Sequence, residues 1–242
     1  MTDAVSLGTV DLSQTLDEAA YAGEERALQR RLAELHRASA KAELPVMVAF
    51  EGWDAAGKGS MIHTLTARLD PRGFRVHPVG PPRPFEEARP WLWRYWQTIP
   101  SRGAWAFFDR SWYGRVLVAR MDRLVSEEQW TRAYDEILQF ERTLAADGYL
   151  LLKFFLHIGK DEQRRRLEAL MADPVMAWRV GPEDWQNHRR YAVWERVYDE
   201  ALARTHTPEA PWTVVPATCP FHTRRTVYRT LIDALEARLP SV

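Results

Sequence analysis

Residues 46–60, VMVAFEGWDAAGKGS, constrain the fold of this chain more than any other stretch. The apolar run VMVAF is short and contains two β-branched valines, which is typical of a strand buried on both faces of a sheet. Gly52, Gly57 and Lys58 then fit the phosphate-loop spacing G-x-x-x-x-G-K, and a helical pattern follows. A buried strand, a glycine loop and a helix predict an α/β fold with an anion site at the start of that helix.

Further apolar runs alternate with amphipathic segments along the rest of the chain. We expect strands at 46–50, 74–79, 105–110, 149–158 and 212–217. We expect helices at 20–44, from the loop to 69, at 90–100, after Ser126, and at 160–171, 185–203 and 223–239. This alternation predicts a three-layer α/β domain with a mostly parallel five-stranded sheet and helices on both faces. Residues 1–20 are predicted to be a loose arm or an oligomer contact, and 21–242 a single domain.

Composition excludes several other classes of protein. The chain has 33 basic and 33 acidic residues, which argues against a DNA-, RNA- or membrane-surface-binding protein. The single cysteine, Cys219, cannot form an intrachain disulfide, and the first 25 residues contain no Lys or Arg, unlike a signal peptide. The longest apolar run, YLLLKFFLHI, is too short to span a bilayer. We therefore expect a cytoplasmic protein without a membrane segment.

The phosphate loop departs from the usual pattern in two ways. Gly59 stands where ATP-dependent kinases more often have the Ser or Thr hydroxyl that binds Mg²⁺, and Ser60 comes one position late. Asp54 lies inside the loop, where a carboxylate would repel a bound phosphate unless a cation lies between them. Asp109, at the end of the strand 105–110, can supply a second metal ligand in the Walker B manner. We therefore predict a metal site of Asp54 and Asp109, with Asp54 alternatively orienting the acceptor.

Several other residues are candidates for binding phosphate groups. Lys58 can contact the outer phosphates, and the planar guanidinium groups of Arg110 and Arg115 suit phosphate oxygens. The helix 160–171 is strongly basic and can form part of a lid at about 160–185. The predicted phosphate- and nucleotide-binding residues are Gly52, Ala55, Ala56, Gly57, Gly59, Ser60, Arg115, Arg165, Arg166 and Arg179. The plainer alternatives are a glycine-rich turn with a solvated lysine, an N-capping Asp109, core aromatics at Trp112 and Tyr113, and an arginine-rich solvated helix face.

Taken together, these motifs resemble the polyphosphate kinase 2 family. The resemblance rests on FEGWDAAGKGSM, DPRGFRV, PWLWRYWQTIP, FDRSWYGRVLV and KFFLHIGKDEQRRRLEALMADP, with PEDW and TPEAPWTVVPA further along. It covers roughly residues 44–239 and is far more specific than the phosphate loop alone.

The resemblance implies a thymidylate-kinase-like P-loop fold that transfers a phosphoryl group between inorganic polyphosphate and a nucleotide, with Mg²⁺ as cofactor and Mn²⁺ as the alternative. By resemblance, Asp54 orients the acceptor or the metal, Lys58 contacts the transferring phosphate and Asp109 holds metal. Arg110 binds nucleotide phosphate, and Arg165 and Arg166 belong to the lid. The sequence looks most like the branch that phosphorylates AMP, with ADP or GDP as alternative acceptors. The family also implies a homodimer or homotetramer.

The sequence departs from the family toward fewer charges. Met176 and Ala177 stand where related lids usually carry a lysine and an arginine, and His63 stands where a lysine is common. Because each charge-assisted hydrogen bond is worth about 1.5–3 kcal/mol, the grip on a polyanion should weaken. Two other readings therefore stay open: an ATP-dependent small-molecule kinase, against which Gly59 counts, and a weakened member that binds nucleotide or polyphosphate without turnover.

Overall fold

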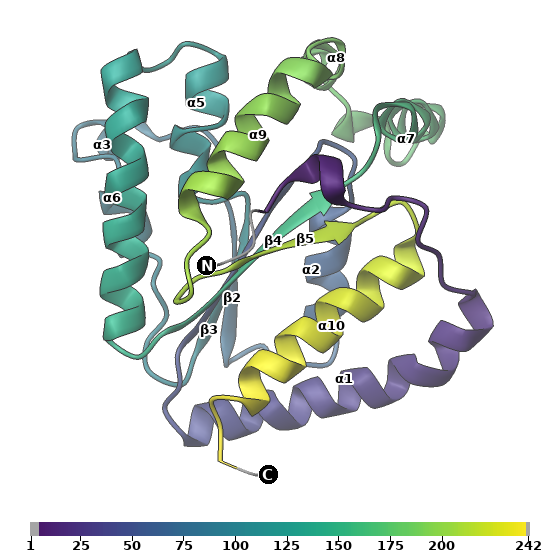
Figure 1. Cartoon of the computed structure of the whole chain (residues 1–242). Coiled ribbons are helices and arrows are strands. Elements are labelled where there is room, and N and C mark those ends of the chain that lie inside the picture. The colour runs from purple at the N-terminus through teal and green to yellow at the C-terminus, as the bar shows by residue number, and fades with distance from the viewer. Residues whose placement is uncertain (1–4, 241–242) are drawn as a thin grey trace.

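The computed structural model describes residues 5–240, which form a five-stranded parallel sheet with helices on both of its faces (Figure 1). The strands are β1 (Val46–Gly52), β2 (Phe74–Pro78), β3 (Trp105–Asp109), β4 (Leu150–His157) and β5 (Trp212–Pro216). Their order across the sheet is β2-β3-β1-β4-β5, and each neighbouring pair is parallel. The predicted fold class is confirmed.

The helices form two layers. Figure 1 shows α6 (Glu127–Ala146) and α9 (Tyr191–Thr205) on one side of the sheet, with α1 (Glu18–Lys41), α2 (Lys58–Thr66) and α10 (Pro220–Glu236) on the other. Two further helices follow β4 in the chain: α7 (Lys160–Ala172) and α8 (Pro182–Arg189). The shorter elements are η1 (Leu7–Thr9), α3 (Pro84–Glu87), α4 (Trp93–Trp96), η2 (Trp112–Arg115), α5 (Val118–Met121) and η3 (Ala177–Arg179).

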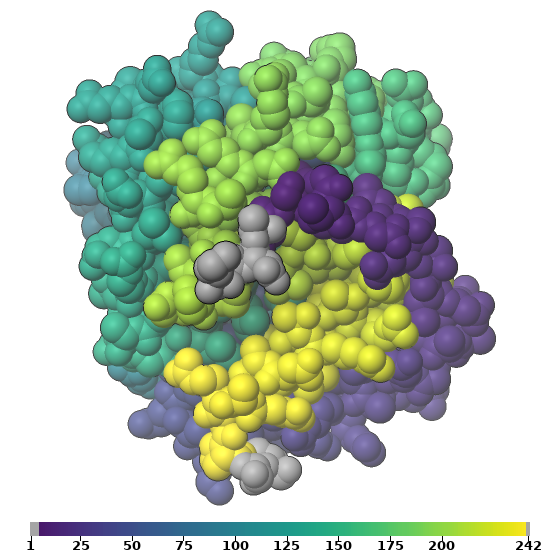
Figure 2. Space-filling model, in the orientation of Figure 1, coloured from purple at the N-terminus to yellow at the C-terminus, as the bar shows by residue number. Residues whose placement is uncertain are grey.

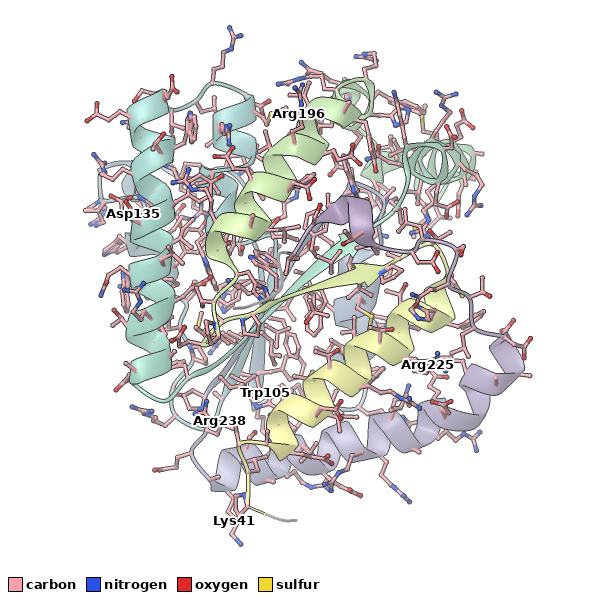
Figure 3. All side chains as sticks on the ribbon, in the orientation of Figure 1. Lys41, Trp105, Asp135, Arg196, Arg225 and Arg238 are labelled. Carbon is pink, nitrogen blue, oxygen red and sulfur yellow. The ribbon has the colours of Figure 1, made fainter. Side chains whose placement is uncertain are left out.

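The local sequence explains why these elements form. All seven residues of β1 are buried, as expected for the central strand of a sheet covered on both faces. Helix α6 begins with a capping box, in which the Ser126 hydroxyl accepts from the N–H of Gln129 and the Gln129 side chain accepts from the N–H of Ser126. Figure 3 shows Trp105 in the interior and Lys41 and Asp135 on the outside, in line with their burial.

Two helices differ from the sequence prediction. The aromatic segment 90–100 contains only the short helix α4, because Pro90 and Pro100 bound it and turns flank it. The helix expected at 185–203 is two helices, α8 and α9, which meet at Arg190. The Arg190 side chain donates to the Met121 carbonyl at 2.8 Å, which ties this junction to α5. Helix α8 contacts the phosphate loop, because Asn187 donates to Asp54 at 3.0 Å.

The described part of the N-terminal segment is held against the domain. The backbone N–H of Leu7 donates to the Asp199 carboxylate of α9 at 2.7 Å, and the Leu7 side chain is buried in the core. The N–H of Leu16 donates to the sulfur of Cys219 at 3.4 Å, just before α10. Figure 2 shows this segment on the surface between α9 and α10. The described part of the arm thus contacts the domain at Leu7 and Leu16, and residues 1–4 lie outside the described residues.

None of the helices within residues 5–240 combines the length and the apolar character that a bilayer-spanning helix needs.

Candidate active site

A cleft of about 840 Å³ lies at the carboxyl ends of β1 and β3. This is the edge where open parallel sheets bind ligands. The phosphate loop between β1 and α2 forms its floor, and α7, α8 and the start of α10 contribute walls. Most of the predicted site residues line it: Asp54, Ala55, Ala56, Gly57, Lys58, Gly59, Ser60, Asp109, Arg110, Arg166 and Arg179.

The backbone of the loop has the left-handed turns that a phosphate cradle requires. Ala55 has a φ of 62°, and Gly57, which precedes the first residue of α2, has a φ of 99°. Gly52 has a φ of 134°, and a Cβ there would lie 2.4 Å from the Leu156 carbonyl oxygen on β4. Gly52 therefore allows the loop to leave the sheet beside β4 without a steric clash.

Lys58 is buried and folded back over its own loop. Its Nζ donates to the carbonyl oxygens of Gly52 at 2.8 Å and Trp53 at 2.9 Å. Burial lowers the pKa of Lys58, and the nearby carboxylates of Asp54 and Asp109 oppose that shift. The ammonium group thus lies inside the loop, and the Lys58 side chain is one of the residues that line the cleft.

Asp54 is held on both carboxylate oxygens. Its Oδ1 accepts from Nη2 of Arg110 at 2.9 Å, and its Oδ2 accepts from Nδ2 of Asn187 at 3.0 Å. Arg110 has a positive φ of 62°, and its backbone N–H donates to the Phe50 carbonyl of β1 at 3.0 Å. The turn after β3 thus brings the guanidinium group to the phosphate loop.

The position of Asp109 gives a structural reason for glycine at residue 59. Parallel register places Asp109 beside Phe50 of β1, one strand away from the loop. A Cβ on residue 59 would lie 3.4 Å from Oδ2 of Asp109, so a side chain at this position would extend toward the carboxylate. With glycine there, the space in front of Asp109 stays open to the cleft.

The donor set of the cleft fits a hard divalent cation. Asp54 and Asp109 bring two carboxylates to one cleft, and Mg²⁺ is usually bound by one or two carboxylates together with substrate phosphates. Within residues 5–240, no group of three or more His, Cys, Asp or Glu side chains is placed to hold a metal by itself. These residues therefore suit a metal that shares its ligands with a phosphate, rather than an all-protein cage.

Arg166 connects the phosphate loop to the other side of the cleft. Its Nη1 donates to the carbonyls of Ala55 and Ala56 at 3.2 and 3.3 Å. Its Nη2 donates to the carbonyls of Ala217 and Thr218 at 2.6 and 3.0 Å, in the loop before α10. One guanidinium group from α7 thus fixes the relative position of two loops that border the cleft.

Three predicted phosphate-binding residues do not line the cleft. Gly52 is buried beneath the loop. The guanidinium of Arg115 lies 5.7 Å from the centre of the Trp91 ring, and its Nε is buried with no hydrogen-bond partner among the described residues. Arg165 points into solvent and pairs with Glu162 on its own helix at 2.7 Å. The i, i+3 spacing of Glu162 and Arg165 favours this local ion pair.

Sequence reasoning also missed residues that line the cleft or hold its floor. Asp184 and Arg224 line it, and burial raises the pKa of Asp184. Asn187 contacts Asp54, and Gln163 of α7 donates to the Asp54 carbonyl at 3.3 Å. All four lie in helical stretches whose sequence shows only a solvated, charged pattern. The motif PEDW carries part of the family resemblance, but it does not indicate that α8 turns a face toward the loop.

The aromatic residues after Arg110 are core residues, as the plainer alternative held. Trp112 Nε1 and the Tyr113 hydroxyl both donate to Oε1 of Glu141, at 2.9 and 2.8 Å. Glu141 pairs in turn with Lys153 at 2.8 Å, and both charged side chains are buried, at 2% and 1% exposure. This buried cluster anchors η2 directly behind Arg110.

A phosphate loop with a facing acid at the edge of a parallel sheet defines a P-loop protein of the kinase type, and comparison with known proteins places the chain further. Residues 15–241 match the sequence profile of the family described as Polyphosphate kinase 2 (PPK2). The chain therefore belongs to the polyphosphate kinase 2 family.

Individual relatives agree with this assignment. The chain is 40% identical over 231 residues to a polyphosphate:AMP phosphotransferase of Pseudomonas aeruginosa, covering 96% of this chain and 47% of that protein. It is 38% identical over 210 residues to an AMP/ADP-polyphosphate phosphotransferase of Meiothermus ruber, covering 86% of this chain and 79% of that one. A crystal structure of a polyphosphate kinase 2 from Arthrobacter aurescens TC1 has a TM-score of 0.93 at 30% identity, covering 100% of this chain and 90% of that one.

The chain spans about half the length of the polyphosphate:AMP phosphotransferases that it matches, with 46% to 47% of each covered.

Proposed function

We propose that this protein transfers a phosphoryl group from inorganic polyphosphate to a nucleotide, with AMP as the main acceptor and ADP as product. The observation that carries the proposal is the arrangement of the cleft. Asp54, Gly57 and Lys58 of the phosphate loop line the cleft together with Asp109 and Arg110 from the end of β3, and Arg110 donates to Asp54 at 2.9 Å. The names of the relatives from Pseudomonas and Meiothermus support the same donor and acceptor.

The protein's own residues align two polyanions and neutralise their charge, which is most of what phosphoryl transfer requires. The loop N–H groups and Lys58 bind the donor phosphates, and Arg110 binds phosphate of the acceptor. Asp54 orients the acceptor or a metal. Asp109 would hold the metal on the side that Gly59 leaves open. Bound Mg²⁺ would supply charge neutralisation between the two substrates.

Other parts of the cleft have supporting roles in this proposal. Arg166 keeps the phosphate loop and the loop before α10 at a fixed separation. The segment at 160–185 acts as the lid, with Arg179 at its inner side and Met176 where related lids carry a cation. A cytoplasmic location and a homodimeric or homotetrameric assembly remain predictions of the sequence.

One assay series with MgCl₂ tests the proposal. Purified protein is incubated with either polyphosphate or ATP as donor and with AMP, GMP, ADP or GDP as acceptor, and the products are separated by nucleotide chromatography. We expect ADP from AMP with polyphosphate, and its loss when EDTA removes the metal. Turnover with ATP but not with polyphosphate would establish an ATP-dependent kinase, and binding without turnover would establish a non-catalytic member.

A further inference from the structure

We propose that Asn187 of α8 is a positioning residue that sets the direction in which the Asp54 carboxylate points. The inference rests on the proposed function and deepens it. It assigns a role in that reaction to a residue outside the phosphate loop. It also links the orientation of the Asp54 carboxylate to the position of α8.

The first step is the geometry of the Asn187 side chain. Its Nδ2 donates to Oδ2 of Asp54 at 3.0 Å, and its Oδ1 accepts from Nε1 of Trp194 at 3.1 Å. An indole N–H can only donate, so the oxygen of the amide must face Trp194 and the nitrogen must face Asp54. Trp194 thereby fixes the amide in the orientation that donates to the carboxylate.

The second step is that the carboxylate has little freedom left. Arg110 donates to Oδ1 while Asn187 donates to Oδ2, so hydrogen bonds from two different elements fix the plane of the group. The Asp54 side chain is only 13% exposed, which limits competition from water. Each oxygen retains a lone pair that can face a metal or an acceptor phosphate.

A second path runs from α8 to the backbone of the same residue. Nδ1 of His188 lies 2.9 Å from Oε1 of Gln163, and Nε2 of Gln163 donates to the Asp54 carbonyl at 3.3 Å. Consecutive residues of α8 thus reach Asp54 at its carboxylate and, through α7, at its carbonyl. The position of α8 against the phosphate loop and the orientation of the Asp54 carboxylate are therefore coupled.

Such coupling matters because phosphoryl transfer depends on alignment more than on chemistry by the protein. A misplacement of about 1 Å at a reacting group can cost about 10²-fold in rate. Without the Asn187 donor, Asp54 keeps only Arg110 and can rotate toward it. Loss of the Asn187 hydrogen bond should therefore lower the turnover rate rather than weaken binding of the polyphosphate chain.

Two substitutions separate positioning from packing. Asn187→Asp keeps the size of the side chain and an acceptor for Trp194, but it turns a second carboxylate toward Asp54. Asn187→Ala removes both hydrogen bonds and leaves space. If Asn187 only fills space, the aspartate variant stays close to wild type and the alanine variant is worse. If it positions Asp54, the aspartate variant is at least as impaired as the alanine variant.

We expect kcat for polyphosphate-dependent ADP formation to fall by at least about 10-fold in Asn187→Asp, with KM for polyphosphate changed by less than about 3-fold. Gln186→Glu is the matched control, because it adds the same charge at an exposed position one residue away on α8. This control should have the kcat of wild type. An Asn187→Asp variant that folds and turns over like wild type would overturn the inference.

A spectroscopic measurement tests the Asn187–Asp54 contact independently of any enzymatic activity. The side-chain NH₂ signals of Asn187 can be assigned in ¹⁵N–¹H spectra by their loss in Asn187→Asp. We expect them to shift in Asp54→Ala and to stay in place in Asp135→Ala, which is a distant surface change. Unmoved signals in Asp54→Ala would contradict the contact. Wild-type protein without turnover but with this shift would refute the proposed function alone.

Discussion

The Asp54 carboxylate lies 2.9 Å from the guanidinium of Arg110, which joins the phosphate loop to the turn after β3. The two residues are distant in sequence, and parallel pairing of β1 with β3 brings them together. This ion pair stands at the point where, in the proposed reaction, the acceptor would meet the donor.

The first prediction concerns the charge of Asp54. We expect Asp54→Asn to lower kcat by at least about 10²-fold, because the amide keeps the shape of the side chain but not the charge that acts in the transition state. The measurement is steady-state ADP formation from AMP and polyphosphate. Asp135→Asn on the exposed face of α6 is the control, and near-wild-type turnover in Asp54→Asn would remove this carboxylate from the mechanism.

The second prediction concerns Gly52 and Gly57, the two glycines of the loop that have a positive φ. Gly52→Ala should lower the free energy of unfolding by at least about 2 kcal/mol, because its Cβ would lie 2.4 Å from a backbone carbonyl oxygen of β4 that cannot move aside. Gly57→Ala should cost only about 1–2 kcal/mol, since its φ is positive but no atom lies within 4 Å of the added Cβ. Urea unfolding of both variants checks the order, and equal costs would contradict it.

The third prediction concerns pH and the buried imidazole under the loop. Trp53 Nε1 donates to Nδ1 of His157 at 2.9 Å, so this nitrogen must be unprotonated. Burial lowers the pKa of His157 to about 4, below the value of about 6.5 expected in the unfolded chain. The unfolded state therefore binds more protons between these values. The contribution of His157 is complete above pH 6.5 and is lost as the pH falls toward 4.

A non-titrating variant isolates this contribution. His157→Asn offers an amide oxygen that can accept from Trp53 but does not titrate in this range. Between pH 7 and pH 5, wild type should lose about 2 kcal/mol more unfolding free energy than the variant does. Urea titrations at the two pH values measure the difference, and parallel losses in the two proteins would show that His157 is not the group responsible.

The fourth prediction concerns the buried pair behind η2. Lys153→Met should destabilise the protein by about 3–5 kcal/mol, because it leaves Glu141 as an unpaired buried charge. Adding Glu141→Gln, which can still accept from Trp112 and Tyr113, removes that charge and should recover at least about 1 kcal/mol. A double-mutant cycle by denaturant unfolding gives the coupling, and strictly additive losses would contradict the pairing.

The fifth prediction concerns the lid. Met176 lines the cleft, so Met176→Lys places a cation toward the bound polyanion and should lower KM for polyphosphate by about 10-fold at low salt. The gain should shrink as ionic strength rises. Val175→Lys adds the same charge at a neighbouring side chain that is 75% exposed and does not line the cleft. An equal gain in both variants would indicate general charge rather than a lid contact.

Much of the fold follows from local patterns. Apolar runs predict β1, β3, β4 and β5, because a strand covered on both faces of a parallel sheet is mostly apolar. The edge strand β2 differs, since it carries Arg75 and His77 and is partly exposed. The same runs place the phosphate loop directly after β1 and Asp109 at the end of β3, with Lys58 at the start of the following helix. The order of the strands could not be predicted in this way, since adjacency of β1 and β3 depends on pairing between distant segments. The sequence predicts Asp54 and Asp109 as a pair only by assuming that adjacency.

The remaining differences have local physical causes. Arg165 prefers Glu162 on its own helix, and Arg115 lies against Trp91, so neither reaches the cleft although both belong to basic motifs. Asn187 reaches Asp54 from α8, which is separated from α9 at Arg190, and no proline or glycine marks that break. A single asparagine on a polar helix carries no sequence signal of its own.

The most direct test of the central claim is ADP formation from AMP and polyphosphate with Mg²⁺, measured for wild type and Asp54→Ala side by side. We expect ADP formation that depends on polyphosphate, on the metal and on Asp54. ADP formation that proceeds unchanged in Asp54→Ala, or that requires ATP in place of polyphosphate, would contradict it.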